Sequence, residues 1–81
     1  MLIIKFNRRM KKNFHIGALI KEECQRQNLP VAVLADRICC ARANVYNIFK
    51  RRNIDIELLA AISKVLNRNF ILECANAIEL A

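Results

Sequence analysis

The chain has 81 residues and a mass of 9.4 kDa, which is enough for one small domain and excludes a deep catalytic cleft between two lobes. Hydrophobic residues make up 56% and charged residues 26%, a composition typical of a globular protein. The single Gly and the single Pro argue against a turn-rich all-β architecture. No uninterrupted apolar run approaches the ~20 residues that a membrane span needs, so we expect no membrane partner.

The charge is basic and unevenly distributed. Fourteen Lys and Arg residues oppose seven Asp and Glu residues, which gives a net charge of +7. Residues 1–52 hold twelve of the basic and three of the acidic residues, whereas residues 53–81 hold two basic and four acidic ones. This balance favours a polyanionic partner, nucleic acid above all, over a charge that serves only solubility.

The cysteines predict neither a metal site nor disulfides. Cys24, Cys39, Cys40 and Cys74 form no C-x-x-C pair, and His15 is the only histidine. Zinc sites need paired ligands at short spacing, and no secretion signal indicates an oxidising compartment. We therefore expect four reduced thiols that pack as small apolar side chains, with no metal and no cofactor.

Residues 1–15 contain no acidic residue and form a basic N-terminal arm. The first six residues, 1–6, are too short for the apolar region of a signal peptide, and their positive charges follow that region. We therefore expect the protein to stay in the cytoplasm. The same stretch is rich in β-branched residues, which suits either a flexible arm or an edge strand that pairs with another chain.

Helical periodicity begins at residue 16. It predicts a helix that ends near Asn28, because Pro30 disfavours helical geometry in the residue before it. Gly17 is unusual inside such a helix and predicts the close approach of a neighbour. The apolar positions of this helix are Ile16, Leu19, Ile20 and Cys24, and the residues that face the other way are Lys21, Glu22, Gln25 and Arg26.

The same pattern predicts helices over residues 31–38, 42–51, 56–66 and 70–80. Pro30 suits the start of the second helix, and Asp55 is a good N-cap for the fourth. The fold class is therefore all-α, a compact bundle of four to five short helices with a central helix-turn-helix. The predicted inward residues of the middle helices are Val31, Leu34, Ala35 and Ile38, then Val45, Ile48 and Phe49, then Ile56, Leu59, Ile62 and Leu66.

Two short helices joined by three or four residues have the geometry of a helix-turn-helix. Residues 34–48 resemble the signature of the lambda-repressor-like helix-turn-helix domain, of the Cro/repressor or XRE type. That family places a small Ala in the first helix, a tight turn four residues later, and Val or Ile six residues after that. These places are here Ala35, Cys39 and Val45. Residues 16–21 and 55–66 resemble the family's first and fourth helices, so the resemblance spans about residues 16–66.

The sequence departs from the family pattern at four positions. The turn residue is commonly Gly, so Cys39 is expected to adopt the conformation of that Gly or a variant of it, with strain on the order of 1 kcal/mol if φ is positive. Ala41 offers no cap where Ser or Thr is common, Val31 replaces a phosphate-binding Gln, and Arg51 replaces a common Gly. Phosphate anchoring is therefore expected from backbone N–H groups at helix starts and from basic residues.

The inward residues of the helix over 42–51 decide which of its side chains face a DNA groove. Arg42 can donate two hydrogen bonds to guanine, Asn47 can pair with adenine, and Ala43 can touch a thymine methyl group. Tyr46 is either a further base contact or a partly buried packing residue, and a solvated cation is the alternative for Arg42. The expected phosphate contacts are Asn44, Lys50, Arg51 and Arg52, and the expected contacts of the arm are Arg8, Arg9, Lys11 and Lys12.

These residues predict sequence-specific binding of double-stranded DNA by a helix in the major groove, in a transcriptional regulator of the bacterial nucleoid. One such helix reads only about four base pairs, so a homodimer on half-sites roughly 34 Å apart is expected. Residues 16–69 form the helix-turn-helix domain. Residues 70–81 form an apolar C-terminal helix, which either makes the dimer contact or packs back on its own core.

Three other functions stay open. The chain can be the antitoxin of a toxin–antitoxin pair whose tail binds a small protein partner, a non-specific nucleic-acid or RNA-binding module, or a protein–protein adaptor that uses residues 70–81. An enzyme is not expected. His15 has no obvious Cys or Ser nucleophile positioned by sequence, and a single Gly excludes a Gly-rich phosphate loop.

Overall fold

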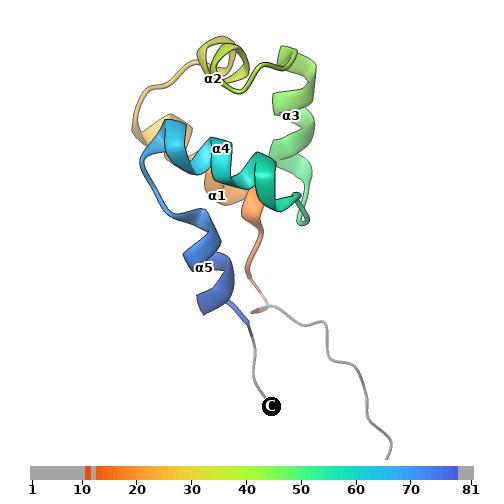
Figure 1. Cartoon of the computed structure of the whole chain (residues 1–81), viewed down its shortest axis with the longest axis vertical. Helices are drawn as coiled ribbons and strands as arrows, with labels where there is room; N and C mark the ends of the chain where they lie inside the picture. Colours follow the sequence, from red (N-terminus) through yellow and green to blue (C-terminus); the bar gives the residue numbers. More distant parts are fainter. Residues whose placement is uncertain (1–10, 12, 79–81) are drawn as a thin grey trace, which may run out of the picture.

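The computed structural model describes residue 11 and residues 13–78, and the helices in this part confirm the predicted all-α bundle. Residues 1–10, 12 and 79–81 lie outside it, and with them the arm residues Arg8, Arg9 and Lys12. None of the described helices has the length and apolar character needed to cross a bilayer. In chain order the helices are α1 (Ile16–Arg26), α2 (Val31–Arg37), α3 (Arg42–Lys50), α4 (Ile56–Leu66) and α5 (Phe70–Asn76) (Figure 1).

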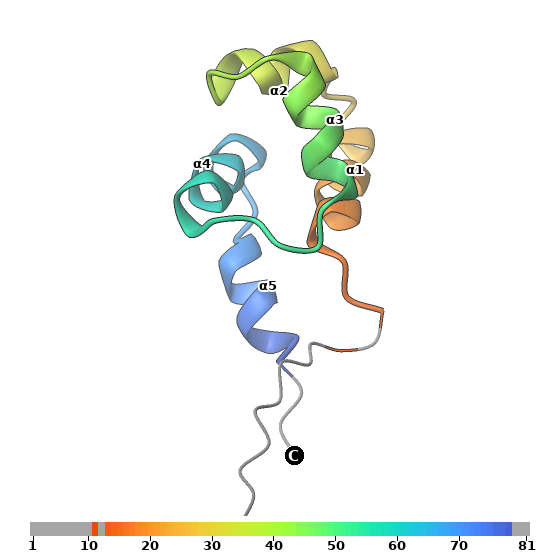
Figure 2. The same ribbon diagram turned by 90° about the vertical axis from the view of Figure 1, so that its right-hand side faces the viewer.

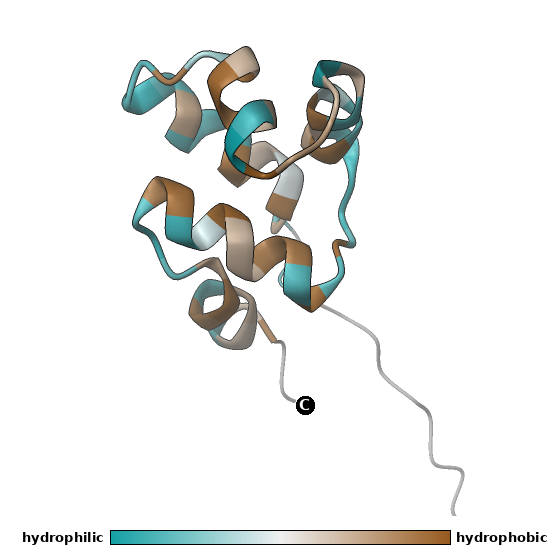
Figure 3. Ribbon diagram, turned by 45° about the horizontal axis from the view of Figure 1, so that its top comes forward, coloured by the Kyte–Doolittle hydropathy of each residue, from teal (hydrophilic) through white to brown (hydrophobic). Residues whose placement is uncertain are grey.

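The helices pack around one core. α3 contacts both α1 and α2, α4 contacts α2 and α5, and α5 lies at the opposite end of the molecule from α2 (Figure 1). Figure 2 shows α3 beside α1 on one side of the bundle and α4 with α5 on the other. Hydrophobic and hydrophilic residues are mixed along the helices, as expected for helices that turn one face toward a common core (Figure 3).

The core contains most of the apolar residues that the periodicity placed inside. Those with at most 4% of their surface exposed are Ile16, Ile20, Cys24, Leu34, Ala35, Val45, Ile48, Leu59, Ile62, Leu66, Phe70 and Ala77. The prediction for Ile56 is wrong, because its side chain is 62% exposed. It is the first residue of α4.

Side chains and backbone turns satisfy the hydrogen-bonding groups at the helix ends. His15, Asp55 and Asn69 each accept a hydrogen bond from the third backbone N–H that follows, at the starts of α1, α4 and α5. The predicted N-cap role of Asp55 is therefore confirmed. At the other ends, Asn28 (φ 56°) and Asn67 (φ 53°) adopt the left-handed conformation that Asn tolerates after a helix.

α5 ends earlier than the predicted residue 80. Its last residue is Asn76, and the carbonyl of Ala77 accepts a hydrogen bond of 2.7 Å from the backbone N–H of Lys11. This carbonyl therefore bonds to a segment 66 residues earlier in the chain. Ser63 Oγ accepts the N–H of Phe70 at the other end, so α5 is held to α4 where it begins.

Gly17 is the point of closest approach between α1 and α3, as its place inside an amphipathic helix predicted. Its N–H donates a 3.0 Å hydrogen bond to the carbonyl of Arg51. A Cβ at this position would lie 2.6 Å from the carbonyl oxygens of Phe49 and Arg51, and closer still to that of Ile48. These three are backbone atoms, so no side chain can move aside for even a methyl group.

A buried carboxylate, which the sequence did not reveal, ties α1 to the start of α5. Glu23 is 3% exposed and accepts hydrogen bonds from Arg26 Nε (3.0 Å), Gln27 Nε2 (2.7 Å) and Arg68 Nη1 (2.8 Å). Arg68 also pairs with Glu73 of α5 at 2.6 Å. The bonds from Arg26 and Gln27 lower the pKa of Glu23 to about 2, against the effect of burial, which raises it.

We expect Gly17→Ala to lower the free energy of unfolding by about 1–2 kcal/mol, because the clash with backbone outweighs the ~1 kcal/mol that Ala gains over Gly in a helix. Ala18→Gly, at the exposed neighbouring position, is the matched control and reports that propensity alone. Urea unfolding should therefore give a lower free energy of unfolding for both Gly17→Ala and Ala18→Gly than for the wild type. A more stable Gly17→Ala protein would contradict the close approach.

We expect Glu23 to make stability pH-dependent in acid. Its pKa is lower in the folded state, so its contribution is fully present above the unfolded value of 4.5 and is lost as the pH falls toward about 2. Urea unfolding of Glu23→Gln should therefore differ most from the wild type above pH 5 and converge with it near pH 2. Glu22→Gln, an exposed carboxylate one residue earlier, should not reproduce this pattern.

Candidate nucleic-acid interface

The turn between α2 and α3 is closed by the backbone. The N–H of Cys40 donates to the carbonyl of Ala35 at 2.9 Å, and the N–H of Cys39 donates to that of Asp36 at 3.2 Å. This pattern ends a helix with one left-handed residue, and Cys39 is that residue, with φ 58°. At this position, where Gly is common in the family, φ is therefore positive, which is the case for which strain was expected. The side chain of Ala35 is 3% exposed beside this turn.

The rotation of α3 is set by two buried aliphatic side chains. Val45 is fully buried and Ile48 is 3% exposed, as the three-residue spacing predicted. Because these residues face inward, the opposite side of α3 is free of its own chain. The side chains exposed on this side are Arg42, Ala43, Asn44, Tyr46, Asn47 and Lys50. This set includes every predicted base contact.

The position of Tyr46 is compatible with both alternatives that the sequence left open, a base contact and a packing residue. Its side chain is 54% exposed, so the phenol can reach a partner. Its ring also packs edge-on against Phe49, with 6.3 Å between the ring centroids. The contact holds the Tyr46 ring at the margin of the exposed face, close to the half-buried part of α3.

The N-terminal end of α3 offers uncapped backbone donors. Ala41 precedes the helix and has no side-chain acceptor, as the sequence predicted. The first N–H groups of α3, at Arg42 and Ala43, point out of the helix start and carry the positive end of the helix dipole. No acidic residue lies in this first turn, so the end keeps its affinity for an anion.

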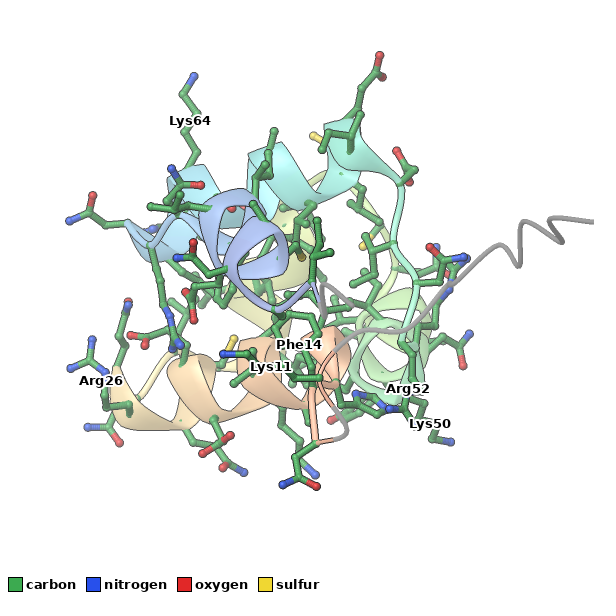
Figure 4. The ribbon with its side chains drawn as sticks, turned by 90° about the horizontal axis from the view of Figure 1, so that it is seen from below. Lys11, Phe14, Arg26, Lys50, Arg52 and Lys64 are labelled. Carbon is green, nitrogen blue, oxygen red and sulfur yellow. The ribbon has the colours of Figure 1, made fainter. Side chains whose placement is uncertain are left out.

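The basic run at the other end of α3 is attached to the start of α1. Arg51 ends the helix with an extended backbone (φ −89°, ψ 140°), so this position does not need the Gly that is common in the family. Arg52 Nη2 donates a 3.2 Å hydrogen bond to the carbonyl of Phe14. Figure 4 shows Arg52 and Lys50 on the same side of the molecule, with Phe14 close to Arg52. Arg51 and Arg52 both stay exposed.

Of the four predicted DNA contacts of the arm, Lys11 is the one within the described part. Its side chain is exposed, and its backbone is held by the bond to Ala77. Arg8, Arg9 and Lys12 lie outside the described residues, so their predicted DNA contacts stay predictions. Within the described part, no three His, Cys, Asp or Glu side chains gather to hold a metal ion.

Two residues of α1 that the sequence placed on a solvent face also border this interface. Lys21 and Gln25 line a pocket together with Tyr46 and Lys50 of α3. Helical periodicity shows only that such residues point away from the core of their own helix. It holds no signal for which neighbouring helix lies beside them.

The family model described as helix-turn-helix matches residues 20–71, which covers most of the chain. The chain belongs to the helix-turn-helix family. No curated protein and no solved structure is similar enough to the chain to count as a match. The match to the family model confirms the resemblance to the lambda-repressor-like type, and α2 and α3 are the helix pair of a DNA-binding helix-turn-helix domain.

We expect Cys39→Gly to stabilise this helix-turn-helix by up to about 1 kcal/mol, because Gly adopts the left-handed conformation without steric cost. Cys39→Ala is the matched control, since it removes the thiol but keeps the Cβ that causes the strain. Thermal unfolding should give a higher midpoint for the Gly variant only. Equal midpoints for both variants would contradict strain at the turn.

Proposed function

We propose that the chain is a transcriptional regulator that binds specific double-stranded DNA sites with α3 in the major groove. The observation that carries this proposal is the burial of Val45 and Ile48, which leaves the polar side of α3 exposed. An α-helix fits the major groove, where each base pair presents a distinct pattern of donors and acceptors. A basic N-terminal two-thirds supplies the attraction for the phosphate backbone.

The first six residues of α3 carry the proposed base contacts. Arg42 donates to O6 and N7 of a guanine, and Asn47 pairs with N6 and N7 of an adenine. Ala43 contacts a thymine methyl group, and Tyr46 reaches a base at the edge of the site. The exposure of these four side chains supports the assignment, because each is free to form new contacts without breaking the core.

The proposed phosphate contacts lie among the base contacts at Asn44 and after them at residues 50–52. Lys50 and Arg51 extend from the C-terminal end of α3, and Asn44 stands near its start. Arg52 uses one N–H on the carbonyl of Phe14 and keeps its other guanidinium donors for a phosphate. The bond to Phe14 limits the motion of Arg52, which lowers the entropy that phosphate binding costs.

We further propose that two copies bind a two-fold symmetric site. One α3 reads too few base pairs to select a site in a genome, and a second copy doubles the sequence that is read. Leu72 (55% exposed) and Ile78 (50% exposed) at the C-terminal end of the described chain give an apolar surface that supports this role for residues 70–81. The half-sites are expected roughly 34 Å apart.

Selection of bound sites from random duplex DNA tests the function. We expect Arg42→Ala to cost about 1–3 kcal/mol of binding and to relax one base position of the selected motif, whereas Lys50→Ala weakens all sites alike. Lys64→Ala, an exposed lysine of α4, is the control and should leave the motif unchanged. If Arg42→Ala changes neither motif nor affinity, Arg42 is not a base-reading residue.

A further inference from the structure

A pocket of about 320 Å³ lies between α1 and α3, next to the proposed DNA face. Its volume is at the lower end of the range typical of small-molecule sites. Half-buried side chains supply its apolar lining, with Leu29 from the loop after α1, Val31 from the start of α2 and Phe49 from α3. The pocket is therefore suited to a small apolar group.

The charge around the pocket has one sign. Lys21 of α1 and Lys50 of α3 both line it, and no acidic side chain does. The ion pairs among the described residues join Arg26 and Arg68 to carboxylates. Neither lysine takes part in one of them. Two ammonium groups from different helices therefore favour an anionic group at the edge of an apolar site.

We propose that this pocket binds a small aromatic carboxylate. The ring lies against Leu29, Val31 and Phe49, where aromatic and aliphatic contacts stabilise it. The carboxylate lies toward Lys21 and Lys50, which each donate a charge-assisted hydrogen bond. The exposed position of both lysines lets them close on a ligand without a change in the core.

A bound ligand also competes with DNA. Tyr46 and Lys50 line the pocket and belong to the proposed DNA face, so one set of side chains serves two partners. This second step rests on the proposed function, whereas the binding of the carboxylate does not. A small carboxylate would thereby release the regulator from its site.

The probe is 2-naphthoate, added to the full chain without DNA and followed through the amide resonances in two-dimensional NMR. We expect saturable shifts at Lys21, Val31 and Phe49, with a dissociation constant of about a millimolar or lower. The neutral 2-naphthamide should bind more weakly, because it keeps the ring but lacks the charge. Shifts elsewhere, no saturation, or equal binding of the two compounds would overturn the proposal.

Two variants locate the site. Lys21→Gln should weaken 2-naphthoate binding roughly two- to fivefold and leave 2-naphthamide unaffected, as expected for an exposed ion pair. Val31→Phe places a ring in the pocket and should weaken both compounds, with folding checked by thermal unfolding. Lys64→Gln on α4 is the matched control and should change neither. If Lys64→Gln acts like Lys21→Gln, the charge effect is not local and the site is wrong.

The effect on DNA is measured separately, by fluorescence anisotropy on a selected duplex. We expect 2-naphthoate to weaken DNA binding at the concentrations that saturate the pocket, and 2-naphthamide to do so less. If the carboxylate saturates the pocket while DNA affinity stays constant, the competition is overturned. If no duplex is selected at all, the proposed function fails, and the ligand titration without DNA still decides the pocket.

Discussion

The position of α3 depends on the contact that Gly17 makes possible. Because this residue has no side chain, the last carbonyl groups of α3 lie directly against α1, and the N–H of Gly17 bonds to Arg51. The burial of Val45 and Ile48 then fixes the rotation of the helix about its own axis. Position and rotation together determine which polar side chains the molecule presents to a partner.

Neither α2 nor α3 is long enough to be stable alone in water, so tertiary packing must hold both. The positive φ of Cys39 shows that the turn between them is kept at some cost in strain. Glu23 and Arg68 join α1 to the start of α5 through partly buried hydrogen bonds. The helix-turn-helix therefore packs against helices that are themselves connected by hydrogen bonds.

Much of this fold follows from local sequence. Apolar spacing located the five helices, and residues such as Gly17, Cys39 and Asp55 were predictable because each satisfies a local geometric demand. Contacts between distant segments were not predictable. The backbone of Lys11 bonds to Ala77, just after the end of α5, and the buried Glu23 bonds to Arg68, 45 residues away. The exposed face of α3 was predictable as a pattern, whereas its neighbours Lys21 and Gln25 were not, because periodicity holds no information on which helices meet.

The measurement that tests this arrangement most directly is an NMR titration of the labelled chain with a duplex that carries its selected site. If the contact with α1 presents the polar side of α3 to the groove, the amide resonances of residues 42–47 should shift most. Those of buried α4 residues such as Ile62 should stay nearly unchanged. Binding of the duplex with no shift in residues 42–47 would contradict the role of α3.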